Sequence, residues 1–100
     1  MRFHALLLGV ALVFCACGPA TVGESCDLLG ETLCEKCFSS QASSCLNGFR
    51  SNCCIGSNCT YTVKDSGKVL QCNDQIRTGS CTSMVQGNLP AICYGVATPR

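Results

Sequence analysis

Apolar residues recur at helical spacing directly after Thr21. The stretch Thr21-Val-Gly-Glu24 fits a capping box, in which the N-cap side chain and the carboxylate three residues later each accept from the other's backbone amide. Behind it, apolar positions follow at steps of three or four, as on one face of an amphipathic helix. These positions are Val22, Cys26, Leu29, Leu33 and Cys37. The pattern predicts a helix over about residues 22–38.

A second apolar face follows after a short Ser-rich connection. Its positions are Ala42, Cys45, Leu46, Phe49 and Cys53. We expect Ser39 or Ser40 to cap this helix and Gly56 to stop it. Gly48 lies inside the helix and weakens it by up to about 1 kcal/mol relative to Ala. Two helices joined by so short a connection predict an antiparallel helical hairpin.

The next segment admits two interpretations. Tyr61-Thr-Val63 is β-prone and Asp65-Ser-Gly67 is turn-forming, so one of them is a small β-hairpin over about residues 60–72. The other is a helix capped at Ser66 and stopped at Gly79. One face of that helix would carry Val69, Cys72 and Ile76. We prefer the helix because its start, its periodicity and its stop agree.

The C-terminal part predicts one or two short helical turns. Thr82 is the expected cap of the first, and Pro90 suits the first position of the second. The patterns together predict a small disulfide-rich, all-α domain over residues 22–96, followed by a loose tail at residues 97–100. It would consist of an antiparallel helical hairpin, a third helix and short helical turns. The alternative fold class is α+β, with the small hairpin described above.

The beginning of the chain has a different pattern. Arg2 and His4 precede an uninterrupted apolar run over residues 5–14. A cationic head before about ten apolar residues is typical of a secretory signal peptide, and a buried N-terminal helix is the alternative. The run is too short for a membrane span, which needs about 20 apolar residues.

The residues Phe14-Cys15-Ala16-Cys17 resemble the bacterial lipobox, in which a small residue precedes the Cys that receives diacylglycerol. The resemblance implies a signal peptide at residues 1–16, lipidation of Cys17 and a lipid-anchored linker at residues 17–21. Ordinary cleavage after Ala20 competes with this prediction and would make the signal peptide residues 1–20.

Cysteine makes up 12 of the 100 residues, above the roughly 8–10% that marks a disulfide scaffold. Cys15 lies in the leader and Cys17 is lipidated or removed, so ten remain under either cleavage. They are Cys26, Cys34, Cys37, Cys45, Cys53, Cys54, Cys59, Cys72, Cys81 and Cys93. In an exported chain this even number predicts up to five disulfides. The hairpin predicts the pairs Cys26–Cys53 and Cys37–Cys45.

Cys34-Glu-Lys-Cys37 has the spacing of half a zinc site and of a thioredoxin-like redox pair. A zinc site needs a second pair of ligands. The sequence has no second Cys-x-x-Cys, and its only histidine is His4. A redox pair is expected in a strand–helix context, whereas the flanks here are helical. We therefore expect two structural half-cystines, no metal and no cofactor, and keep a thiol-disulfide redox role for Cys34 and Cys37 as a minority hypothesis.

The charged residues point to no class of charged partner. Lys and Arg number seven and Asp and Glu six, interspersed along the chain, so no basic stripe predicts binding to nucleic acid. Without a histidine after the leader, the Ser-His-Asp and Cys-His arrangements are excluded as usually built. The acidic residues along the first helix are expected to form a solvated face: Glu24, Asp27, Glu31 and Glu35. We predict that the protein is not an enzyme.

Two family resemblances bear on function. The Cys53-Cys54 pair is similar to that of plant lipid-transfer and albumin-type domains, but the Cys-x-Cys that these carry downstream is missing here. In its leader and composition the chain resembles small cysteine-rich bacterial lipoproteins. That resemblance implies a protein attached to the outer membrane or cell envelope through Cys17, with a structural or interaction role. The alternative is a soluble, extracellular cysteine-rich binding protein, such as an inhibitor, a toxin or a lipid carrier.

Overall fold

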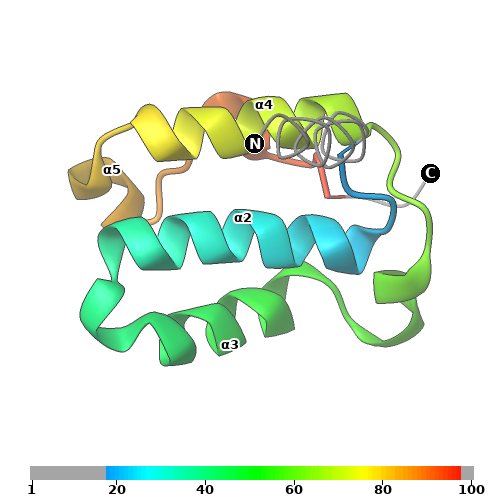
Figure 1. Cartoon of the computed structure of the whole chain (residues 1–100), viewed down its shortest axis with the longest axis horizontal. Coiled ribbons are helices and arrows are strands. Elements are labelled where there is room, and N and C mark those ends of the chain that lie inside the picture. The colour runs from blue at the N-terminus through cyan, green and yellow to red at the C-terminus, as the bar shows by residue number, and fades with distance from the viewer. Residues whose placement is uncertain (1–17, 98–100) are drawn as a thin grey trace, which may run out of the picture.

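The computed structural model describes residues 18–97, which form a small, mostly helical, disulfide-rich domain (Figure 1). Its elements in chain order are α2 (Val22–Cys37), η1 (Ser39–Gln41), α3 (Ala42–Cys53), η2 (Gly56–Thr60), α4 (Ser66–Thr78), α5 (Cys81–Val85) and η3 (Ala91–Cys93), where η marks a 3₁₀ helix. The all-α prediction is confirmed. None of the helices among these residues has the length and hydropathy that a membrane crossing requires.

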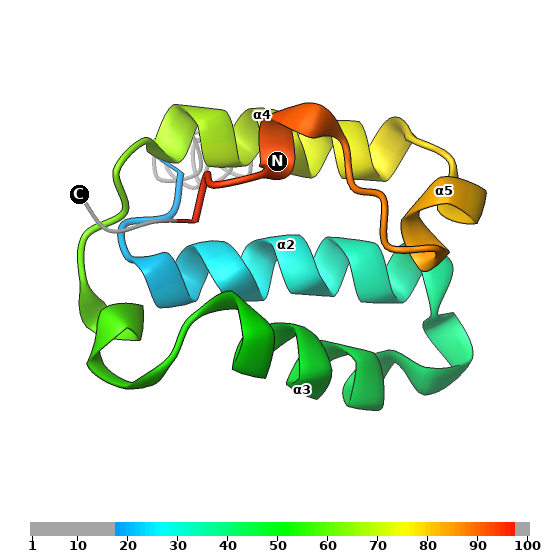
Figure 2. The ribbon, with the colours of Figure 1, turned by 180° about the vertical axis from the view of Figure 1, so that it is seen from behind.

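Helix α2 lies in the middle of the domain, with α3 along one side and α4 along the other (Figures 1 and 2). Its N-terminus has the capping box that the sequence predicts: Glu24 N–H donates to Thr21 Oγ1 at 3.1 Å, and Thr21 N–H donates to Glu24 Oε1 at 3.3 Å. The apolar face predicted for this helix is buried, apart from Cys37, which is half-buried. The central position explains this burial, because α2 is covered from two sides.

Helices α2 and α3 form the predicted antiparallel hairpin. All five apolar positions predicted for α3 are half-buried, and none is fully buried, because α3 packs on one side only. The expected serine cap is wrong. The η1 turn takes up Ser39 and Ser40, and α3 starts after Gln41, whose side chain makes no capping bond. The helix also stops at Cys53, before Gly56, because Cys54 takes an extended backbone.

The β-hairpin alternative over residues 60–72 is wrong because Ser66–Thr78 form α4. The buried face of α4 is the predicted one, and its N-cap is Asp65 instead of Ser66. The β-prone residues 61–63 instead lie beside the start of the described chain. Val22 N–H donates to Tyr61 O at 2.9 Å, and Val63 N–H donates to Ala20 O at 3.0 Å. The predicted linker is therefore paired with the domain from Ala20 onward.

The last elements are shorter than α4 and close the other side of the core. Helix α5 is capped by Ser80, not by the expected Thr82, and Pro90 immediately precedes η3 instead of starting it. The C-terminal segment crosses the face of α4 seen in Figure 2 and ends its described part at Ala97. Its Cys93 and Val96 join the core that α2 and α4 build.

The C-terminus of α4 is held by a side chain from α2. The Lys36 ammonium donates to three carbonyl oxygens, those of Ile76 at 3.0 Å, Arg77 at 2.6 Å and Gly79 at 2.5 Å. These carbonyls form the negative end of the helix dipole, where a cation is favourable. Lys36 thus supplies a C-terminal cap from a residue about 40 positions earlier in the chain.

We expect Lys36→Met to lower the free energy of unfolding by about 1–2 kcal/mol, because charge-assisted hydrogen bonds to a helix terminus are lost. For a domain of this size the melting temperature should fall by roughly 4–8 °C per kcal/mol, measured by circular dichroism. Lys64→Met is the matched control, since Lys64 is exposed and caps no helix. Equal melting temperatures for the two variants would contradict the capping role.

The α2–α3 contact is closest at Gly30, which is buried in α2. A Cβ built at Gly30 would lie 2.9 Å from Leu46 Cδ1 and 2.9 Å from Phe49 Cδ1. Disulfides join the two helices on either side of this point, so the helices cannot simply move apart. Gly48 in α3, by contrast, has open space around its would-be Cβ.

We expect Gly30→Ala to destabilise the domain by about 1–3 kcal/mol, because overpacking exceeds the gain in helix propensity. Gly48→Ala should instead stabilise it by about 0.5–1 kcal/mol. Chemical denaturation of the oxidised proteins measures both. A stabilising Gly30→Ala would show that the helices are not in close contact.

Candidate functional site

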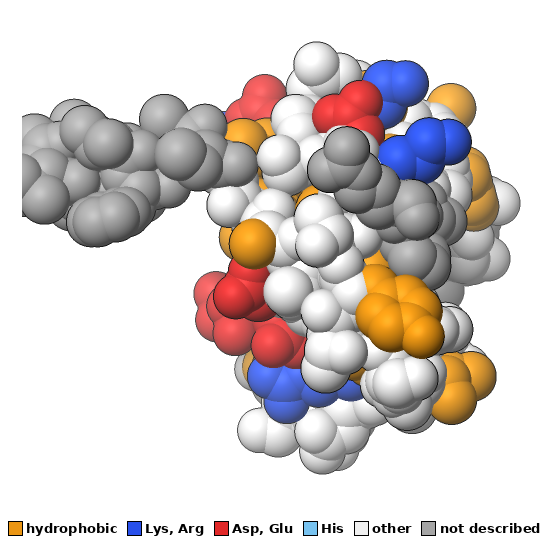
Figure 3. Space-filling model, turned by 90° about the vertical axis from the view of Figure 1, so that its right-hand side faces the viewer, with side chains coloured by type: hydrophobic (Ala, Val, Ile, Leu, Met, Phe, Trp, Pro, Cys, Tyr) orange, Lys and Arg blue, Asp and Glu red, His pale blue; other side chains and the backbone are white. Residues whose placement is uncertain are grey.

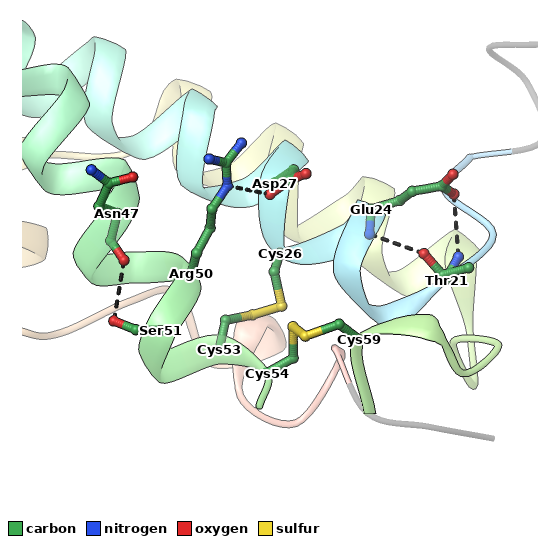
Figure 4. Close-up of polar contacts among 10 residues, drawn as sticks. All are labelled: Thr21, Glu24, Cys26, Asp27, Asn47, Arg50, Ser51, Cys53, Cys54 and Cys59. Carbon is green, nitrogen blue, oxygen red and sulfur yellow. Dashed lines mark hydrogen bonds and ion pairs between the residues drawn. A yellow bond between two sulfur atoms is a disulfide. The ribbon is translucent and has the colours of Figure 1, made fainter. Parts of the chain in front are cut away.

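All ten cysteines between residues 26 and 93 are joined in disulfides. The pairs are Cys26–Cys53, Cys34–Cys45, Cys37–Cys81, Cys54–Cys59 and Cys72–Cys93. Figure 4 shows the end of the α2–α3 hairpin where two of them lie close together. The predicted pair Cys26–Cys53 is present, and the predicted pair Cys37–Cys45 is wrong.

The register of the hairpin explains the error. Cys26 and Cys34 are eight positions apart on α2, and Cys45 and Cys53 are eight positions apart on α3. Antiparallel helices of equal rise therefore carry Cys26–Cys53 and Cys34–Cys45 in one register. The predicted pair Cys37–Cys45, together with Cys26–Cys53, would match a spacing of eleven positions on α2 with one of eight on α3. The two helices would then be out of register by about 4.5 Å. This equal spacing is visible in the sequence and could have predicted the pair Cys34–Cys45.

Cys34 and Cys37 are bonded to different elements of the domain. Cys34 is bonded to α3 through Cys45, whereas Cys37 is bonded to α5 through Cys81. The Cys-x-x-Cys disulfide that a redox role requires is therefore not formed. Among residues 18–97, no group of three or more His, Cys, Asp or Glu side chains is placed to hold a metal ion.

The acidic row predicted along α2 is only partly free in solvent. Glu24 is used in the capping box, and Asp27 forms an ion pair with Arg50 of α3 at 2.6 Å (Figure 4). Glu31 and Glu35 are exposed. The ion pair is itself solvent-exposed, so it contributes little to stability and marks no catalytic dyad.

An apolar cavity of about 360 Å³ lies where α2, α3, α4 and the C-terminal segment meet. Its walls include Leu29 from α2, Phe49 and Cys53 from α3, Cys72 and Ile76 from α4, and Leu89. The volume is within the range of small-molecule sites, which are mostly apolar with a few polar groups. Of the described residues that line the cavity, Tyr94 is the one with an ionisable side chain that is not a disulfide cysteine.

Two polar side chains stand among the lining residues. The Asn52 side-chain amide donates to Gly48 O at 2.9 Å, and Tyr94 Oη accepts from Leu89 N–H at 3.1 Å. The second bond joins the two parts of the C-terminal segment that line the cavity. The sequence predicts Leu29, Phe49, Cys53, Cys72 and Ile76 only as positions on buried helix faces, and Cys93 only as a half-cystine. It gives no signal for the other lining residues, which include Asn52, Leu89 and Tyr94.

The cavity wall is covalently reinforced. Cys53 is bonded to α2 through Cys26, and Cys72 is bonded to Cys93, which also lines the cavity. A void in an ordinary core is reduced as its surroundings relax inward. Here the disulfides limit that movement, so the hollow is built into the framework.

The signal peptide predicted at residues 1–16 and the lipidation site predicted at Cys17 lie outside the described residues, as do residues 98–100 of the predicted tail. No protein-family model, curated protein or solved structure matches the chain.

We expect the disulfides to contribute unequally to stability. In the loop-entropy picture, Cys54–Cys59 closes a separation of 5 residues and should contribute about 2 kcal/mol, whereas Cys37–Cys81 closes 44 and should contribute about 4 kcal/mol. Replacing each pair by serines and unfolding the variants with guanidinium measures the difference. All four cysteines are half-buried, so each pair serves as the control for the other. A larger loss for Cys54/Cys59 would contradict the entropic account.

Proposed function

We propose that the chain is an exported protein, held at the outer membrane or cell envelope by lipid on Cys17, with a structural or interaction role and no catalytic activity. The observation that carries the export part is the pairing of all ten cysteines after the leader. Disulfides form and persist in oxidising compartments outside the cytosol. The cationic and apolar leader supplies a route to such a compartment.

The lipid anchor rests on Ala16-Cys17 and is compatible with the position of the following residues. Ala20 and Thr21 are paired with residues 61–63, at the end of the molecule seen in Figure 3. Apolar, basic and acidic side chains are interspersed there, and Ile55 and Tyr61 are exposed at 74% and 49%. An anchor attached just before Gly18 would hold this end near a membrane. An Asp directly after the lipidated Cys resembles a signal for retention at the inner membrane. Gly18 stands at this position, so the outer membrane is favoured.

A soluble, secreted cysteine-rich binding protein is the second candidate. The apolar cavity favours this candidate, because a carrier of small molecules needs a binding site of this kind. A carrier does not need to be anchored to a membrane. Both candidates share the export route and the disulfide framework. They differ in the first residue of the mature chain and in its modification.

The intact mass of the protein purified from its native envelope tests the first candidate. We expect a chain that starts at Cys17 and is heavier by a diacylglyceryl group, usually with a further acyl chain, and that lacks ten thiol hydrogens. Stable membrane attachment needs two or more acyl chains, so the protein should sediment with membranes.

The matched variants are Cys17→Ser and Cys15→Ser. Cys17→Ser should abolish both the lipid mass and the membrane sedimentation, whereas Cys15→Ser should leave both unchanged. An unmodified wild-type chain beginning near Thr21 would exclude the anchor and support the secreted candidate. Free thiols in the native protein would contradict both.

A further inference from the structure

A second hollow lies directly beside the apolar cavity. It measures about 550 Å³ and shares Tyr94 and Gly95 with the cavity, so these two residues separate one space from the other. The chemistry of the second hollow is different, because Lys64, Asp65 and Lys68 line it. An uncharged apolar space and a charged space thus meet at one pair of residues.

The charge of the second hollow is positive. Its two lysines face a single carboxylate, and Asp65 is already engaged as the N-cap of α4, where Oδ1 accepts from Lys68 N–H at 3.1 Å. Among residues 18–97, no carboxylate lies within salt-bridge distance of the ammonium group of Lys64 or Lys68. An anion bound in this hollow would therefore interact favourably with two ammonium groups whose charge is not already neutralised by a neighbouring carboxylate.

We propose that the two hollows together bind a single-chain anionic amphiphile. Its hydrocarbon chain lies in the cavity between Phe49, Ile76 and Leu89, and its carboxylate or phosphate head lies beside Lys64 and Lys68, across Tyr94. This inference names the ligand for the interaction role proposed above and does not depend on the lipid anchor. The lining residues all follow Thr21 and are present under either cleavage.

Size and charge favour this ligand over a macromolecule. A stable protein interface buries about 800 Å² on each partner over a broad surface, whereas this cavity is a concave space of about 360 Å³, the size of a small-molecule site. None of the described residues that line the cavity carries a positive charge, so we expect an anionic head group to lie outside the cavity. Within the described part of the chain, Lys64 and Lys68 are the basic residues that line either hollow.

The binding experiment is a displacement titration on the oxidised mature chain carrying Cys17→Ser, so that no acyl group of its own competes. The fluorescent probe is uncharged N-phenyl-1-naphthylamine, and the competitors are octanoate, decanoate, dodecanoate, decyl phosphate and 1-decanol. The dissociation constant should fall about fourfold for each added methylene until the cavity is full. Decanoate or decyl phosphate should bind at least threefold more tightly than 1-decanol, although the alcohol is the more hydrophobic compound.

Which anionic head is preferred identifies the source of the ligand. Tighter binding of decanoate indicates a fatty acid, and tighter binding of decyl phosphate indicates a phosphate-bearing lipid. Raising the ionic strength should weaken the anions and leave 1-decanol unchanged, because only the head group interacts through charge.

Two sets of variants distinguish binding of the head group from binding of the hydrocarbon chain. Lys64→Gln and Lys68→Gln should each raise the dissociation constants of the anionic competitors about threefold without changing that of 1-decanol. Arg77→Gln is the control for charge, since Arg77 is exposed on α4 and lines neither hollow. Leu89→Trp should fill the cavity and weaken every competitor at least tenfold. Val85→Trp is its control, at an exposed residue outside the cavity.

Four results would overturn the proposal: no saturable displacement from folded, fully oxidised protein; equal or tighter binding of 1-decanol; lysine variants without effect; or binding only after removal of residues 98–100. The last would show that the chain's own C-terminus occupies the cavity. An unlipidated native protein would refute the lipid anchor without affecting the amphiphile proposal. A lipidated native protein that binds no amphiphile would refute the amphiphile proposal without affecting the anchor.

Discussion

The covalent attachment of α2 to its neighbours is the constraint on which the rest of this structure depends. Three of the five disulfides start from this helix, two reaching α3 and one reaching α5. The sequence offers few large apolar side chains and no tryptophan, and a domain of this size is marginal without cross-links. The cross-links fix the helices at distances that packing alone would hold weakly. The close approach at Gly30 and the Lys36 cap on α4 depend on this arrangement.

The same framework accounts for the hollow between the helices. A hydrophobic core normally fills its space at crystal-like density, and a void is costly. In this domain Cys53, Cys72 and Cys93 line the cavity. Their disulfides, to Cys26 and between Cys72 and Cys93, join the elements that form its wall. Stability comes largely from restricting the unfolded chain, and the core is free to leave space for a ligand. Structure and proposed binding therefore share one cause.

Location and ligand are separate questions for this protein. The proposed export rests on the leader and the paired cysteines, whereas the proposed ligand rests on an apolar cavity beside two lysines. If the lipid anchor is present, the exposed Ile55 and Tyr61 lie at the end where the chain begins, and an amphiphile would be collected at or near a membrane. If the chain is released, the same domain would act as a soluble carrier. Neither case needs a catalytic group.

The helices and their buried faces could be predicted from the sequence, because the capping box at Thr21 and the spacing of apolar residues are local properties of the chain. One disulfide, Cys26–Cys53, could be predicted in the same way, and the equal spacing of Cys26–Cys34 and Cys45–Cys53 indicates a second. Three other features depend on how the elements pack in space: the bond from Cys37 to Cys81, the cap of Lys36 on α4, and the position of Tyr94 between two hollows. Each of these joins segments distant in sequence. Periodicity shows which face of a helix is covered, but not which element covers it.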